Sequence, residues 1–312
     1  MSETISVLLN NYNYGSYVCD SVRSVLRQTH VVDELIVVDD GSTDDSLSRL
    51  QSAFADDPQV RIVAKSNGGQ LSAFNAGFDA CRGDTVFFLD ADDLHEPGYV
   101  QGVMDVFHRR PDVDFVASSF RTFGAIESVN HNGRSGGCAG YSVLRAYYAG
   151  AWIGTVTSGL AIRRSLLERL LPYAEEARWR TCADDCLVIG SSLAGAKKYF
   201  LTIPAVAYRV HGGNRFWGVR PTGDASYGLL HARIKLLSDL APFRRDAAGQ
   251  AALLVHEARS IETLCWEDWW QLLRVWRRIE DDPQAMRRGF FSLLKIALMK
   301  IFGRMRRVTD QA

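Results

Sequence analysis

Signals for secretion and for membrane spanning are absent from this chain of 312 residues. The N-terminus has no basic segment followed by an apolar run, as a secretory signal would have. No apolar run approaches the roughly 18 residues that a membrane-spanning helix needs. The six cysteines are scattered, and only Cys182 and Cys186 lie close together, without the second ligand pair of a zinc site. We therefore expect a cytoplasmic protein with reduced cysteines and no zinc.

The chain also lacks compositional bias and net charge. Its 26 glycines and 8 prolines are near average usage, and 47% of its residues are hydrophobic, which excludes a disordered or collagen-like chain. The formal net charge is zero, so global charge does not point to nucleic acid as a partner. Residues 1–114, however, hold 8 basic and 19 acidic residues, whereas residues 115–312 hold 28 and 17. Clustered carboxylates favour a metal ion or sugar hydroxyls as ligands, with a solvated acidic surface as the alternative.

What is present in the first hundred residues is an alternation of short apolar segments with helical patterns. The expected strands are Ile5–Leu9, Leu35–Val38, Val60–Val63 and Thr85–Leu89, and the expected helices are Tyr17–Gln28, Ser46–Phe54 and Gln70–Cys81. Strands that are apolar throughout are covered on both faces, so we predict an α/β fold with a mainly parallel sheet sandwiched by helices. We interpret residues 118–142, rich in glycine and polar residues, as a loop or linker. Residues 224–312 have an almost entirely helical pattern.

Polar side chains follow three of the predicted strands, at the sheet edge where open α/β sheets bind ligands. They are Asn10, Asn11 and Tyr12 after the first strand, Asp39 and Asp40 after the second, and Asp90, Asp92 and Asp93 after the fourth. Carboxylates at i and i+2, here Asp90 and Asp92, can reach one hard cation such as Mg²⁺, which typically adds water and substrate phosphates. An Asp-rich turn exposed to solvent is the alternative at any one strand end. Taken together, the strand ends predict one coherent site.

The order and spacing of several short motifs resemble an inverting glycosyltransferase of family 2, which has the GT-A fold. The motifs are 6–13 (SVLLNNYN), 24–29 (SVLRQT), 34–44 (ELIVVDDGSTD), 67–77, 90–92, 158–164 (SGLAIRR), 184–185 and 208–214 (YRVHGGN). The resemblance covers about residues 4–215. It implies a GT-A type, Rossmann-like nucleotide-sugar transferase domain over residues 1–223. The helical C-terminal region, residues 224–312, lies outside it.

For the donor, the resemblance implies a nucleotide site at the ends of the first and second strands. Asp40 would accept the N–H of a uracil-type base, and Asn10 and Tyr12 would flank the base, with the Tyr12 ring as a stacking face. Asp90 would hold ribose or donor-sugar hydroxyls. A UDP-sugar is therefore the expected donor.

For the metal and the catalytic base, the resemblance implies three further residues. Asp92 would ligate Mn²⁺ or Mg²⁺, a Lewis acid that stabilises the leaving nucleoside diphosphate. His211 would contact the metal or the diphosphate, although a lone histidine is more often structural. Asp185 aligns with the general base that takes the proton of the acceptor hydroxyl as it attacks and inverts the anomeric carbon. The family usually has Glu-Asp at this position, so the role of Asp184 stays open, and acidic residues also favour helix N-termini.

We thus predict a metal-dependent, inverting glycosyltransferase, with a glycan or glycolipid acceptor that the resemblance alone implies. Trp152 is a candidate sugar-stacking residue or an ordinary buried tryptophan. A nucleotidyltransferase is one alternative, although residues 10–15 contain none of the basic residues that its phosphate loop would need. A nucleotide- or glycan-binding module without activity is the other, and the presence of Asp90, Asp92 and Asp185 speaks against it.

The C-terminal pattern indicates a basic amphipathic helix. Residues 286–307 contain seven basic and no acidic residues, and their apolar residues share one helical face. This pattern favours peripheral contact with the inner face of a membrane, with core or dimer packing as the alternative. The oligomeric state is left open. Upstream, Trp266, Trp269, Trp270 and Trp276 form a helical stripe that we expect to pack against the catalytic domain.

Overall fold

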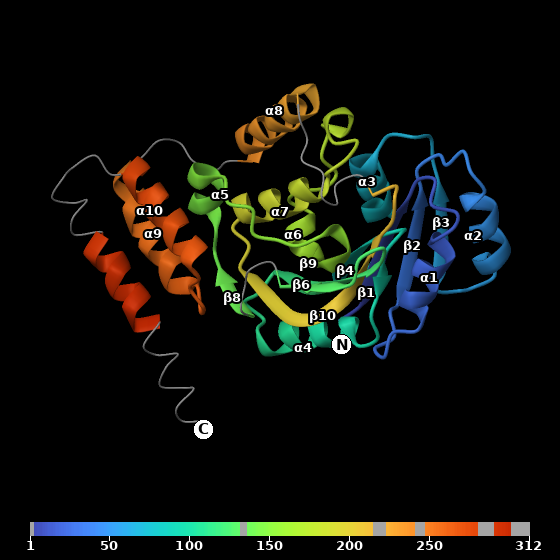
Figure 1. The fold of residues 1–312 in the computed structure, drawn as a ribbon, viewed down its shortest axis with the longest axis horizontal. Helices are drawn as coiled ribbons and strands as arrows, with labels where there is room; N and C mark the ends of the chain where they lie inside the picture. The colour runs from blue at the N-terminus through green and yellow to red at the C-terminus, as the bar shows by residue number, and fades with distance from the viewer. Residues whose placement is uncertain (1–2, 132–135, 215–222, 241–246, 280–289, 301–312) are drawn as a thin grey trace.

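The computed structural model describes residues 3–131, 136–214, 223–240, 247–279 and 290–300. Within these residues, one ten-stranded sheet runs in the order β3-β2-β1-β4-β9-β6-β10-β5, with β7 paired to β6 and β8 to β10 (Figure 1). The strands are β1 (Ile5–Asn11), β2 (Glu34–Asp39), β3 (Val60–Ala64), β4 (Thr85–Asp90), β5 (Leu94–His95), β6 (Phe115–Gly124), β7 (Ser128–Asn130), β8 (Gly137–Gly140), β9 (Leu160–Arg163) and β10 (Lys198–Val210).

Helices cover both faces of this sheet. The helices of the described residues are α1 (Val18–Leu26), α2 (Ser46–Phe54), α3 (Gln70–Ala80), α4 (Tyr99–Arg109), α5 (Val143–Ala149), α6 (Arg164–Leu167), α7 (Asp184–Leu193), α8 (Gly223–Leu240), α9 (Ala247–Ser260) and α10 (Trp266–Ile279), with 3₁₀ turns η1 (Thr157–Gly159) and η2 (Glu176–Arg178). Residues 290–300 are also helical.

Side-chain alternation along the strands explains the two layers. In β1, Leu8 packs into the core beneath α3 and α7, whereas Val7 and Leu9 face α1, α2 and α4 on the other side. Successive side chains of a strand point to opposite faces, so a strand buried on both sides is apolar throughout. Strands β1 to β4 pair in parallel in the order β3-β2-β1-β4. The predicted α/β sandwich is confirmed.

One prediction was wrong. Residues 118–142 are no simple linker, because they contain the end of β6 and all of β7 and β8. Small polar side chains of β6, such as Ser118 and Thr122, are buried while the backbone of the strand pairs with β10. Buried serine and threonine gave this strand the composition of a loop.

The C-terminal helices form a second packing centre. In a third apolar cluster, Leu254 of α9 and Val275 of α10 meet Leu144 of α5, and Leu293 and Ile296 of the helix at 290–300 join them. Figure 1 shows α9 and α10 at the opposite end of the molecule from α2. Among the described residues, no helix combines the length and the apolar character needed to cross a bilayer.

Candidate active site

Strand register brings the predicted site residues together. Asn10 at the end of β1 lies opposite Asp90 of β4, and Asn11 lies opposite Asp39 of β2. A cleft of about 760 Å³ opens above these strand ends. Six of the seven predicted site residues line it: Asn10, Tyr12, Asp40, Asp90, Asp92 and Asp185. The seventh, His211, contacts Asp92.

Asp40 is almost fully buried and holds the glycine-rich turn that precedes α3. Its Oδ1 accepts hydrogen bonds from Lys65 Nζ at 2.7 Å and from the Gly68 amide at 2.9 Å. Its Oδ2 accepts from the Gly69 amide at 2.7 Å and from Asn67 Nδ2 at 3.2 Å. A carboxylate has about four acceptor positions, so these donors use its capacity. A nucleobase N–H would have to share an oxygen with one of them or displace it.

Asp90 is linked through Gln70 to the α7 side of the cleft. The Gln70 Nε2 atom lies 3.3 Å from Asp90 Oδ1, and its Oε1 accepts a hydrogen bond of 2.9 Å from the Ala183 amide. Burial and the negative charge of Asp92 raise the pKa of Asp90 to about 6. Sequence reasoning missed Gln70, whose only signal was its place in the motif 67–77. The Gln70 side chain thus connects the end of β4 to the turn before α7 through two hydrogen bonds.

Asp92 and His211 form the part of the site that fits a divalent cation. Asp92 Oδ2 lies 3.1 Å from His211 Nε2, and the imidazole packs against the Tyr17 ring with centroids 5.1 Å apart. Burial and the charge of Asp92 raise the pKa of Tyr14, which also lines the cleft. Among the described residues, no three or more histidine, cysteine or acidic side chains gather as metal ligands. One carboxylate and one imidazole suit an ion that takes its other ligands from phosphate and water, as Mg²⁺ commonly does.

Asp185 lies in the first turn of α7, as predicted, and is only 3% exposed. Trp152 Nε1 donates a hydrogen bond to its Oδ1 at 2.8 Å, and Arg233 Nε donates to its Oδ2 at 2.7 Å. The neighbouring Asp184 also lines the cleft, and burial together with the charge of Asp185 raises the pKa of Asp184 to about 8. The sequence motifs did not predict Arg233 as a site residue, because it belongs to α8, outside every motif. Trp152 is more than a buried aromatic, since it is 36% exposed in the cleft.

This sheet, with carboxylates at its strand ends and a further aspartate facing them across a cleft, defines a glycosyltransferase of the GT-A type. The chain belongs to Glycosyl transferase family 2, whose family profile matches residues 6–175, more than half of its length. An uncharacterized glycosyltransferase of Nostoc sp. is 35% identical over 215 residues, covering 67% of this chain and 66% of that protein.

Two further similarities agree with this membership. The chondroitin synthase of Escherichia coli is 39% identical over 105 residues, which are 34% of this chain and 15% of that protein. The crystal structure of Staphylococcus aureus TarS 1–349 in complex with UDP-GlcNAc superposes with a TM-score of 0.62 at 17% identity, covering 88% of this chain and 80% of that one. At this identity the likeness supports the fold.

Proposed function

We propose that this protein transfers a sugar from a UDP-sugar to a hydroxyl of a glycan or glycolipid, with inversion at the anomeric carbon and dependence on Mn²⁺ or Mg²⁺. The observation that carries the proposal is one cleft lined by Asp90 and Asp92 at a strand end and by the buried Asp185 on the facing helix. A single displacement needs a general base for the acceptor hydroxyl. It also needs acidic residues that would hold a metal ion against the leaving diphosphate.

The donor would occupy the part of the cleft above β1, β2 and β4. Tyr12 is 45% exposed there, so its ring is free to cover one face of a base. Asn10 and Asp40 lie beside it, and Asp90 follows toward the sugar. UDP-GlcNAc is bound by TarS, which shares the fold, and this supports a uridine donor here.

Asp92 and His211 are the residues that would hold the metal ion. When bound, such an ion supplies Lewis-acid stabilisation of the departing diphosphate. The protein's own contribution is to hold Asp92 Oδ2 and His211 Nε2 close together. The Tyr17 ring packs against the imidazole at a tilt of 37°, and the Arg209 Nε atom donates a hydrogen bond of 2.8 Å to the carbonyl oxygen of Asp92.

Asp185 would take the proton from the acceptor hydroxyl as that oxygen attacks. Trp152 and Arg233 each occupy one carboxylate oxygen, so the side chain is fixed before the acceptor arrives. Each oxygen keeps a second acceptor position for the incoming hydroxyl. Arg233 belongs to α8, so the helical region following the matched segment contributes to the site.

The product's anomeric configuration tests this mechanism. The whole chain is incubated with UDP-sugars of α configuration, oligosaccharide acceptors and Mn²⁺, and the product is examined by NMR. We expect a β-linked product and no product after chelation of the metal. A retained α linkage would contradict the single displacement, and full activity after chelation would contradict the metal.

We further propose that residues 224–312 form a helical region that contacts the inner, cytoplasmic face of a membrane. Of the predicted amphipathic helix 286–307, residues 286–289 and 301–307 lie outside the described part of the structure. In the described part, Leu293 and Ile296 are buried in the helical cluster, which supports the packing alternative for one face. Phe291, 65% exposed, and Met299, 57% exposed, lie on the outer surface and support membrane contact.

A further inference from the structure

A second hollow adjoins the active-site cleft. It has a volume of about 880 Å³ and lies between residues 149–152 and one face of α10. We call it the α10 groove. The donor, metal and base assignments leave it without a role, and α10 lies beyond the residues that match the family profile.

Exposed tryptophans line the α10 groove. Trp266 is 71% exposed, Trp270 is 43% exposed and Trp152 is 36% exposed. The Trp266 and Trp270 rings stand almost perpendicular, with centroids 5.5 Å apart. Exposed apolar surface gathered in a concavity is typical of a ligand site. A sugar ring offers an apolar face for an indole ring to stack against, and hydroxyls at its rim that remain available to polar groups.

The α10 groove is continuous with the catalytic centre through Trp152. This residue lines both hollows, and its indole Nε1 lies 2.8 Å from Asp185 Oδ1. A chain of sugars lying along the α10 groove would therefore reach the general base with its terminal residue. The donor part of the cleft would be left free above the strand ends.

The charge of the α10 groove indicates which glycans it suits. Arg274 and Arg277 line it, and neither side chain has an ion-pair or hydrogen-bond partner among the described residues. The acidic residue of the groove, Glu267, accepts a hydrogen bond from Gln271 Nε2 at 3.3 Å. Two unpaired guanidinium groups bind carboxylate, sulfate or phosphate groups well, because their planar donors match such anions.

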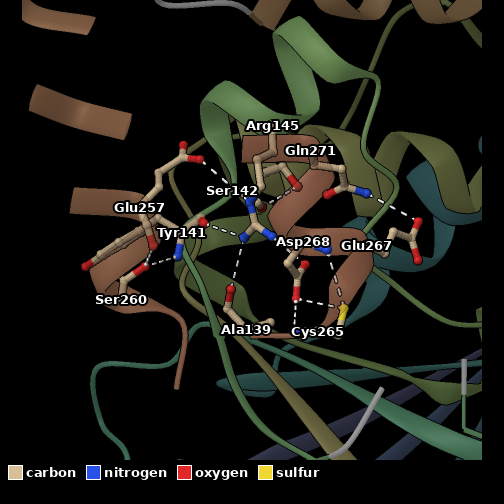
Figure 2. Close-up of polar contacts among 11 residues, drawn as sticks. Ala139, Tyr141, Ser142, Arg145, Glu257, Ser260, Cys265, Glu267, Asp268 and Gln271 are labelled. Atoms are coloured by element: carbon tan, nitrogen blue, oxygen red, sulfur yellow. Dashed lines mark hydrogen bonds and ion pairs between the residues drawn. The ribbon is translucent and has the colours of Figure 1, made fainter. Parts of the chain in front are cut away.

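A buried ion pair anchors the helix that carries these residues. Figure 2 shows Arg145 of α5 pointing at Asp268 of α10, and the Nη1–Oδ1 distance is 2.7 Å. Both side chains are at most 1% exposed. Arg145 Nη2 also donates to the carbonyl oxygens of Ala139 and Tyr141, at 3.1 and 2.8 Å. The pair fixes α10 at Asp268, which lies in sequence between Trp266 and Trp270. Ligand sites on rigid elements are held more accurately than sites on loops.

We propose that the α10 groove binds the part of the acceptor that precedes the accepting sugar, and that this acceptor is an acidic glycan. Trp266 and Trp270 stack on its sugar rings, Arg274 and Arg277 bind its anionic groups, and Trp152 directs its end to Asp185. This inference rests on the proposed function, whose acceptor site it extends.

Calorimetric titration of the full chain tests the inference, with hexasaccharides of chondroitin, hyaluronan and heparin as acidic probes and maltohexaose as the neutral probe. We expect at least one acidic probe to bind more tightly than maltohexaose. Trp266→Ala combined with Trp270→Ala should weaken that binding at least tenfold. Arg274→Gln combined with Arg277→Gln should reduce the acidic probe to the affinity of the neutral one. The matched control is Phe291→Ala, an exposed aromatic outside the groove, which should bind as the wild type does.

Titration of UDP with Mn²⁺ must give the wild-type affinity for every variant, which shows that the fold is intact. Unchanged hexasaccharide binding by the tryptophan variant would overturn the inference, as would a wild type that binds no acidic probe. Tighter binding of maltohexaose would overturn the acidic character. The proposed function fails separately, if the wild type binds hexasaccharides in the groove but transfers no sugar from any UDP-sugar.

Discussion

At the residue scale, Asp185 is held from two sides by donors that are distant in sequence. Trp152 comes from the segment after α5, and Arg233 comes from α8. Hydrogen bonds to a charged group contribute more than neutral ones, about 1.5–3 kcal/mol each. We therefore propose Arg233 as a positioning residue for Asp185, the proposed general base, and expect its removal to affect the chemical step more than substrate binding.

Arg233→Gln should lower kcat about tenfold or more, because one charge-assisted hydrogen bond to Asp185 is weakened. KM for the UDP-sugar should change little. The control is Lys235→Gln on the same helix, since Lys235 pairs with Asp239 rather than with Asp185. Steady-state kinetics distinguish the two variants, and an Arg233→Gln enzyme with the kcat of Lys235→Gln would refute the positioning role.

Asp184 should make stability depend on pH. Its pKa is raised to about 8 from an ordinary value of 3.8, so the folded state keeps a proton that the unfolded chain has lost. Stability is therefore lost as pH rises from about 4 through 8. Asp184→Asn removes this titration. Between pH 5 and 9 the free energy of unfolding should therefore fall less for the variant than for the wild type, and the two changes should differ by about 1 kcal/mol or more.

Urea unfolding at the two pH values measures this difference. Asp56→Asn, in an exposed turn after α2, removes a carboxylate without such burial and should keep the wild-type pH dependence. Parallel pH profiles for the wild type and Asp184→Asn would show that Asp184 is ionised in the folded state at neutral pH.

At the element scale, the N-terminus of α3 is hydrogen-bonded to the segment that precedes α7. The amides of Gln70 and Leu71 donate to the carbonyl oxygens of Arg180 and Trp179, at 3.0 and 3.1 Å. Two amides in the first turn of α3 are thereby bonded to protein, although helix N-termini often bind phosphate. These bonds fix the segment before α7, and they thereby position Asp185 in the first turn of that helix.

The helix at 290–300 carries the membrane proposal at this scale. Deleting it would uncover the third apolar cluster, so we choose substitutions on its outer surface instead. Phe291→Ser combined with Leu298→Ser should reduce co-sedimentation with phosphatidylglycerol vesicles at low salt, because apolar insertion and basic residues act together. Val31→Ser changes a still more exposed apolar residue elsewhere and should bind vesicles as the wild type does. Failure of the wild type to co-sediment would contradict the proposal.

At the scale of the whole molecule, the acidic first part and the basic second part meet at the cleft. The strand ends that carry Asp40, Asp90 and Asp92 come from the first part, whereas Arg233 comes from the second. Local patterns predicted strands β1 to β4 and helices α1 to α3, because each of these elements carries its own run or repeat of apolar residues. It could not predict that α8 reaches Asp185 or that α10 adjoins Trp152, because these contacts depend on packing between segments far apart in the chain.

The motifs predicted which residues gather at the site but not all of the hydrogen bonds that these residues make. Asp92 and His211 were expected at one metal site, and the structure brings them to 3.1 Å. Asp40 was expected at the base, yet its hydrogen bonds to the turn at 65–69 were not foreseen, because local sequence does not show which backbone amides converge on a carboxylate.

The most direct test of the central claim compares UDP binding with turnover in Asp185→Asn. Asparagine keeps the shape of the side chain but cannot take the proton from the acceptor hydroxyl. We predict that the affinity for UDP with Mn²⁺ stays at the wild-type value while turnover falls by about 10²–10⁴-fold, the usual scale of general-base catalysis. Asp184→Asn, the adjacent control, should lower turnover less than Asp185→Asn does. An Asp185→Asn enzyme with wild-type turnover would contradict the assignment of the catalytic base.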